Sequence, residues 1–358
     1  MSLNLINPFM KFASGGGGMP YYEFIGKTTL SGTADSISVD VSSDPRENYM
    51  VLARTKTTDV NYNPTQSFQF DGISNSEYAR VYSEDSGGAS TANSQNYISS
   101  SAQSGQSFSV SYISNYDGYE KLLTYNNTYS NSTATTSVPH GTVMGGKWAN
   151  TSNNIDSTIA IHNETGSVDY AAGSELVVLG YTDATAGDTK WESLADVTLG
   201  SDGTDIDTGV VADLKKDYLF FQILAYRHDG NPAVSIKFND EESSKYTYRK
   251  QTNGASPATL SQQNFIYTDT WGGASPTGNQ LCQINVFVLN RDDDEKLGFY
   301  QMFYNRAGDA ATSNQDQQWG WFRYMTNDQI DQINAFRESG DSGEFAAGSS
   351  LACYGFDA

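Results

Sequence analysis

One stretch of the sequence occurs twice, first as Asp169-Tyr-Ala-Ala-Gly-Ser-Glu-Leu-Val-Val-Leu-Gly-Tyr181 and again as Glu344-Phe-Ala-Ala-Gly-Ser-Ser-Leu-Ala-Cys-Tyr-Gly-Phe356. Shorter matches precede it in the same order: Asp44–Tyr49 with Asp213–Tyr218, Phe70-Asp71 with Phe238-Asn239, and Glu120-Lys-Leu122 with Glu295-Lys-Leu297. The spacing between copies stays between 168 and 175 residues, so the second copy is collinear with the first and carries a net insertion after Tyr246. Self-similarity at a nearly constant spacing indicates a duplicated structural unit.

The repeat divides the chain into four segments, and its 358 residues are enough for about two domains. We expect an N-terminal arm with a glycine hinge over residues 1–20, a first unit over 21–182, a linker over 183–189 and a second unit over 190–358. The linker is short, small and polar, as a connection between two domains should be.

Within each unit the apolar residues recur with a period of two, for example in Ile37–Val41, Phe68–Phe70 and Phe108–Tyr112. Such alternation predicts strands with one face on a core and the other in water. The runs Leu219–Leu224 and Val286–Leu289 are apolar on both faces and suit the centre of a sandwich. We therefore predict an all-β protein with two tandem antiparallel β-sandwich domains of the jelly-roll type, and leave the strand order open.

One segment and two connections stand out from this pattern. Asp328–Phe336 has helical spacing, but its counterpart Asn153–Ile161 alternates like a strand, so we predict a strand in both copies. The longest connections are Ser83–Ser107 and Lys250–Gln280, and loops of this length usually carry function or contact a partner.

The composition limits the classes of partner. The formal net charge is −21 and the pI is about 4.3, which excludes nucleic-acid binding through a basic surface and disfavours anionic membranes. No run approaches the length of a membrane span, and the N-terminus lacks the basic-then-apolar pattern of a secretory signal.

Residues with the spacing of known reactive sites are scarce. The three histidines form no metal-binding motif, and the acidic clusters Asp202–Asp207 and Asp292–Glu295 are interpreted as solvated turns rather than calcium loops. Cys282 and Cys353 are predicted to be buried reduced thiols, although a bridge between them remains open. We accordingly expect no catalytic, cofactor-binding or metal-binding residue, no cofactor, and no enzymatic activity.

Two groups of apolar residues are candidates for contacts with partners. The arm carries Leu5, Ile6, Phe9 and Phe12 ahead of a four-glycine hinge, and it either folds back on its own domain or docks on a neighbouring subunit. Trp148 and Trp271 lie near turn residues, where they could stack on sugars or fill an interface; the alternative is that they cap a core.

One motif of the first unit resembles a known group of proteins. Gly145-Gly-Lys-Trp-Ala-Asn-Thr151, followed by Asp169–Gly180, is similar to sequences of a loosely characterised group of bacteriophage virion proteins. In the second unit Trp319-Gly-Trp-Phe322 replaces the Lys-Trp-Ala-Asn part of the motif. The resemblance implies a virion structural protein and carries over no catalytic residue.

The expected function is therefore that of a non-enzymatic, capsid-associated protein, a shell or decoration subunit that assembles through its jelly-roll flanks and its arm. Its expected partners are copies of itself and other virion proteins, with no direct contact to nucleic acid or membrane, and its expected location is the virion, assembled in the host cytoplasm. The alternative is a tail-fibre or receptor-binding module that recognises host glycans.

Overall fold

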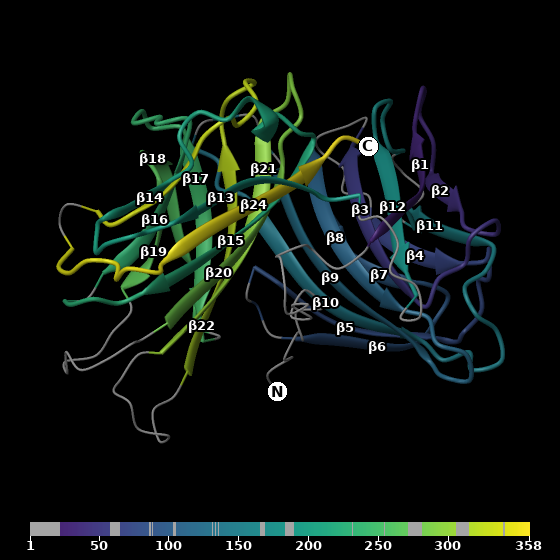
Figure 1. Ribbon diagram of the computed structural model, residues 1–358. Coiled ribbons are helices and arrows are strands. Elements are labelled where there is room, and N and C mark those ends of the chain that lie inside the picture. Colours follow the sequence, from purple (N-terminus) through teal and green to yellow (C-terminus); the bar gives the residue numbers. More distant parts are fainter. Residues whose placement is uncertain are drawn as a thin grey trace. The chain divides into compact units, whose positions relative to one another are not determined.

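The computed structural model describes residues 22–57, 65–85, 87, 89–102, 105–130, 132, 134, 136–164, 169–182, 190–230, 232–253, 255–270, 281–305, 315–338 and 341–358 (Figure 1). The chain divides into two compact units. The first comprises residues up to Thr133, His140–Trp191 and Ala358, and the second comprises Ala134–Pro139 and Glu192–Asp357. Each unit is described by itself.

The first unit has two antiparallel sheets. The broad sheet has the order β1-β12-β3-β8-β9-β10-β5-β6 and the narrow sheet the order β2-β11-β4-β7. The broad-sheet strands are β1 Glu23–Thr29, β12 Glu175–Tyr181, β3 Asn48–Lys56, β8 Gln106–Ser114, β9 Lys121–Ser130, β10 His140–Trp148, β5 Tyr78–Glu84 and β6 Ser90–Gln95. The narrow-sheet strands are β2 Ser36–Asp40, β11 Thr158–His162, β4 Thr65–Phe70 and β7 Ile98–Ala102.

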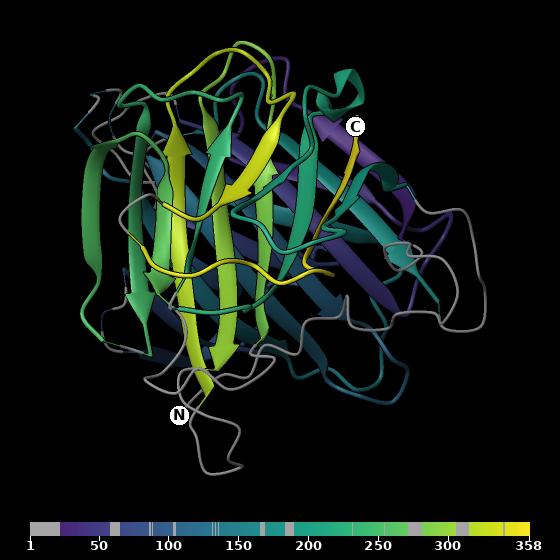
Figure 2. The same cartoon turned by 60° about the vertical axis from the view of Figure 1, so that its left-hand side comes forward.

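The second unit repeats this arrangement strand for strand. Its green and yellow strands lie side by side in Figure 2. Its broad-sheet strands, in order across the sheet, are β13 Glu192–Thr198, β24 Ser350–Phe356, β15 Tyr218–Tyr226, β20 Leu281–Leu289, β21 Lys296–Asn305, β22 Gln315–Tyr324, β17 Tyr246–Thr252 and β18 Ala258–Gln263. Its narrow-sheet strands are β14 Asp205–Asp207, β23 Ile333–Phe336, β16 Ala233–Phe238 and β19 Ile266–Thr270. A single 3₁₀ turn, Ala212–Leu214, is the one helical element of the described residues.

The strand order identifies each unit as an extended jelly roll. If β5, β6, β9 and β10 are set aside, the remaining eight strands, numbered along the chain, pair as 1-8-3-6 in one sheet and 2-7-4-5 in the other. That is the two-sheet arrangement of a jelly roll. The other four strands continue one sheet beyond the roll and make it twice as wide as its partner. The all-β prediction and the jelly-roll prediction are thus confirmed, and the order that the sequence left open is defined.

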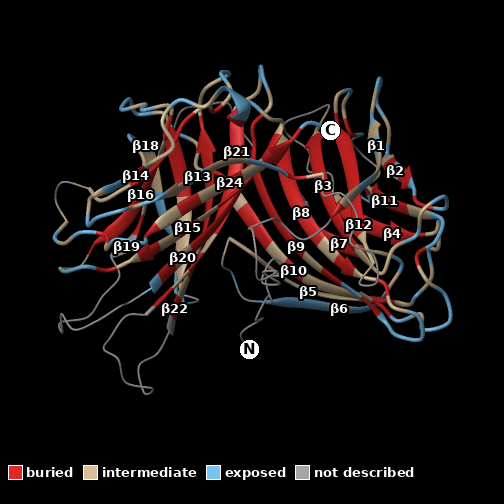
Figure 3. Ribbon diagram, viewed as in Figure 1, coloured by how far each residue is buried: buried red, intermediate tan, exposed pale blue. Residues whose placement is uncertain are grey.

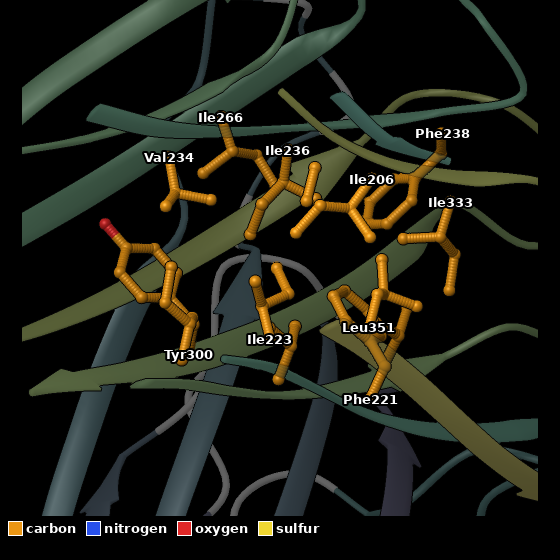
Figure 4. Close-up of a cluster of buried hydrophobic side chains, with 14 of the residues drawn as sticks. Ile206, Phe221, Ile223, Val234, Ile236, Phe238, Ile266, Tyr300, Ile333 and Leu351 are labelled. Atoms are coloured by element: carbon orange, nitrogen blue, oxygen red, sulfur yellow. The ribbon is translucent and has the colours of Figure 1, made fainter. Parts of the chain in front are cut away.

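The core of each unit lies between its two sheets. In the second unit Phe221, Ile223 and Leu351 of the broad sheet meet Ile236 and Ile333 of the narrow sheet, all fully buried (Figure 4). Most central strands are buried, whereas the connections and the edge strand β6 are largely exposed (Figure 3). Because every second side chain of a strand points inward, the alternation that was read from the sequence is what supplies this core.

The duplication extends to individual hydrogen bonds. The Asn115 side chain accepts from the backbone N–H of Ile155 at 2.7 Å, and the Asn290 side chain accepts from that of Ile330 at the same distance. Asp71, with φ 53°, caps the start of β11, and Asn239, with φ 54°, holds the residues before β23 in the same way. Matching left-handed residues with matching bonds show that the copies share backbone detail as well as topology.

Three sequence expectations require correction or confirmation here. The expected long loops Ser83–Ser107 and Lys250–Gln280 in fact hold four strands, β6 and β7 in one and β18 and β19 in the other. The sequence matched Tyr49 with Tyr218, but the structural counterpart of Tyr49 is the next residue, Leu219. Tyr49 pairs with Ile113, and Leu219 pairs with Val288, which is the counterpart of Ile113. Ile333–Phe336 is a strand, as the repeat predicted against the helical spacing.

Candidate functional site

The structure places few of the residues that the sequence singled out. The arm residues Leu5, Ile6, Phe9 and Phe12, the linker over 183–189, and Trp271 all lie outside the described residues. Trp148 is described, and its side chain is fully buried.

The burial of Trp148 corrects its proposed role in glycan or interface contact. Its ring stacks on Tyr78 at a centroid distance of 6.0 Å and lies 5.9 Å from Phe70, and its Nε1 donates to Glu77 at 3.0 Å. In the second unit Tyr324 stacks on Tyr246 in the corresponding position. Trp148 is therefore a core residue, and a glycan could not reach its indole. Tyr324, rather than the Trp319–Phe322 stretch, takes its place in the second copy.

The acidic turn at Asp292–Glu295 surrounds an ammonium group. Lys296 Nζ donates to the backbone carbonyls of Arg291, Asp294 and Asn327 at 2.6, 2.5 and 3.0 Å. Burial lowers the pKa of Lys296 to about 8, and the neighbouring acidic side chains oppose that shift. Lys121 makes the same type of contact in the first unit, where its Nζ donates to the Tyr116 and Tyr119 carbonyls.

The two cysteines are buried residues of the core. Cys282 and Cys353 are free and buried, as predicted, and burial raises the pKa of each thiol. Within the described ranges no group of three or more His, Cys, Asp or Glu side chains has the geometry to hold a metal ion. No helix in the described part of the chain is long and apolar enough to cross a membrane.

The most distinctive cluster lies inside the first unit, on the inner face of its broad sheet. Ser109 of β8, Asn127 of β9, Thr142 of β10 and Glu84 of β5 stand directly opposite one another across four strands. We call this set the polar row. Ser109, Asn127 and Thr142 are each at most 1% exposed.

The sequence pattern of β8 did not predict the polar row. The alternation Phe108-Ser-Val-Ser-Tyr112 predicts that the aromatic and aliphatic residues face the core, but the serines do. Phe108 and Val110 are also buried, yet on the opposite face of the sheet and outside the core cluster. Alternation of apolar and polar residues shows that the two faces of a strand have different surroundings. It shows which face points into the core only when the other face is in water.

A glutamine from the narrow sheet completes the polar interior. Gln66 Nε2 donates to Thr55 Oγ1 at 2.9 Å and to Ser107 Oγ at 2.8 Å. Its Oε1 accepts from Ser109 Oγ at 3.0 Å and from Tyr125 OH at 2.9 Å. The Gln66 amide is thus fully bonded, as a buried amide should be.

The second unit has a more apolar interior at the same place. The residues of the second unit that correspond to Ala53 and the polar row are Ile223, Ile284, Met302, Gln318 and Thr252, in the same order across the sheet. Val234 stands where the first unit has Gln66. The tyrosine hydroxyl of Tyr300, the counterpart of Tyr125, bonds to Gln318 at 2.7 Å. The two copies therefore differ chemically at this one end of the sandwich while sharing their backbone.

Titratable side chains stand at the end of the polar row. Tyr129 donates its hydroxyl to Glu84, and its ring stacks on His140 at 5.1 Å. His140 Nδ1 pairs with Asp85, whose other oxygen accepts from the Gly141 N–H at 3.0 Å. His140 and Asp85 are about one quarter exposed, so this end of the interior lies nearest to solvent.

Comparisons with known proteins add little to this geometry. No family model matches the chain, and no curated protein matches it. Among solved structures, the mouse laminin alpha1 chain domains LG4-5 match at 10% identity and a TM-score of 0.20, over 96% of this chain and 92% of that one. The LG1-3 region of the laminin alpha2 chain matches at 7% identity and a TM-score of 0.19, over 89% of this chain and 64% of that one. Neisserial surface protein A matches at 6% identity and a TM-score of 0.15, over 81% of this chain and 97% of that one. Scores this low carry no argument, so the fold assignment rests on the strand pairing itself.

Proposed function

We propose that this chain is a non-enzymatic structural protein of a bacteriophage virion, associated with the capsid as a shell or decoration subunit. The observation that carries the proposal is the duplicated jelly roll with one strand order in both copies. Jelly rolls recur in viral capsid domains, which is support by analogy of fold. The net charge of −21 suits a protein that must stay soluble at high local concentration before it assembles.

The edges of the broad sheets favour assembly through the arm rather than through strand pairing. These sheets end at β1 and β6 in the first unit and at β13 and β18 in the second, and a register shift interrupts the pairing of each of these edge strands with its neighbour. Ser94 in β6 and Gln262 in β18 are left-handed, with φ 51° and 53°. Irregular, twisted edges are poor templates for another strand. We therefore assign subunit contacts to the apolar residues Leu5, Ile6, Phe9 and Phe12.

The test compares two variants of the full chain by mass photometry and negative-stain imaging. In one, Leu5, Ile6, Phe9 and Phe12 are replaced by serine; in the control, the polar arm residues Asn4, Asn7 and Lys11 are replaced by serine. We expect the wild-type chain and the control to form a closed oligomer or a lattice, and the apolar-to-serine variant to remain dispersed. Identical assembly of all three proteins would remove the arm from the proposal. Wild-type protein that stays monomeric while binding a glycan array through Trp271 would replace the proposal by the receptor-binding alternative.

A further inference from the structure

Two polar side chains inside the first unit lack a partner among the described residues. Asn127 is 0% exposed, and neither its Oδ1 nor its Nδ2 makes a hydrogen bond. The hydroxyl of Ser111, also 0% exposed, makes none. Buried amides in native proteins are almost always bonded, and where protein partners are lacking the bonds go to enclosed water or to a ligand.

Four side chains around Asn127 are smaller than their counterparts in the second unit, whereas Glu84, at the end of the polar row, is longer than its counterpart Thr252. Ala53 and Ser109 occupy the register positions that Ile223 and Ile284 occupy in the second copy. Thr142 likewise replaces the longer Gln318, and Ser111 replaces Val286. The same backbone arrangement therefore encloses less side-chain volume in the first unit, next to the unpaired amide.

The groups that face this space define what could bind there. Asn127 offers a carbonyl oxygen as acceptor and an amide nitrogen with two N–H donors, and Ser111 offers a hydroxyl that can donate or accept. Glu84 and His140, the ionisable groups at this end of the polar row, are engaged with Tyr129 and Asp85. An ion would find no free counter-charge on these two described side chains, whereas a neutral hydroxyl group can both donate to and accept from Asn127 and Ser111.

We propose that the interior of the first unit binds a small neutral hydroxyl compound, either water or a small polyol, through Asn127 and Ser111. The site belongs to the first copy alone, because Met302 and Val286 take these two positions in the second. The duplicated units are thereby specialised: one keeps a polar binding interior and the other a dry core.

The test is a crystal structure of the full chain at a resolution that shows ordered water, from crystals grown without polyol and from crystals soaked in erythritol. We expect density about 2.7–3.2 Å from Asn127 Oδ1 or Nδ2 and from Ser111 Oγ, and none beside Met302 and Val286, which serve as the internal control. Density that changes on soaking identifies a polyol site, and unchanged density identifies water. An Asn127 amide that lies against carbon atoms without any such density, or that bonds to another protein group, overturns the proposal.

A variant provides a second measurement. Asn127→Met with Ser111→Val installs the residues of the second unit, and we expect the density to disappear. Erythritol stabilises most proteins by exclusion, so its effect on the unfolding midpoint is compared between wild type and this variant. A larger shift in the wild type supports a polyol site, and equal shifts together with the crystallographic density support water. If the variant does not fold, the wild-type crystals still decide.

Discussion

Replacing Trp148 by alanine should destabilise the first unit severely. The indole is fully buried between Tyr78 and Phe70. An aromatic side chain of this kind buries about 150–250 Å², which at about 25 cal/mol per Å² corresponds to about 4–6 kcal/mol. The lost bond to Glu77 adds little, because that carboxylate is half-buried and can be rehydrated. We expect a loss of about 4–5 kcal/mol, in line with large-to-small core substitutions.

The assay is calorimetric unfolding of the full chain with two matched variants. A loss of this size should lower the midpoint of the affected transition by about 8–20 °C. Trp148→Tyr supplies the ring type of Tyr324 and should cost only about 1–2 kcal/mol. Tyr119→Ala, at a ring that is 71% exposed, should change stability by less than about 0.5 kcal/mol. A Trp148→Ala protein of near wild-type stability that had lost sugar binding would place the indole on the surface and refute this assignment.

Three further predictions concern the second unit. Asn290→Ala should cost about 2–4 kcal/mol in chemical denaturation, because it leaves the Ile330 N–H and several carbonyls without their partner; a cost below about 0.5 kcal/mol would contradict the role of this cap. Gly320→Ala should lower the unfolding midpoint, since the new Cβ would stand 2.0 Å from the Tyr300 ring, while Gly200→Ala meets nothing within 4 Å and should be neutral. The lowered pKa of Lys296 means that the folded state binds this proton more weakly than the unfolded chain, so the free energy of unfolding should rise with pH from about 8 towards 10, by at most about 1.4 kcal/mol per pH unit. Urea titrations across this range measure the slope, and a slope unchanged in Lys296→Met would show that another group causes it.

Much of the architecture was accessible from sequence because duplication supplied an internal comparison. The repeat argued correctly for a strand at Ile333–Phe336, where local spacing favoured a helix. It could not supply the strand order, because that depends on pairing between distant segments such as β12 and β3.

The polar interior was missed for a different physical reason. Phe108 and Val110 of β8 are buried although they lie on the outer face of the sheet, so the apolar side chains of β8 gave no sign of which face is inner. A comparison of Ser109 and Ser111 with Ile284 and Val286 could have found the difference, since the copies are collinear there. The loops at Ser83–Ser107 and Lys250–Gln280 were misjudged because their short strands are polar edge strands without alternation.

Electron cryomicroscopy of the full-length protein over a range of concentrations tests the central claim most directly. If the duplicated jelly roll is a building block, the images should show a closed oligomer or a lattice, each chain contributing two rolls with the 1-8-3-6 and 2-7-4-5 pairings. Single, unassociated chains at every concentration, or halves with different strand orders, would contradict it.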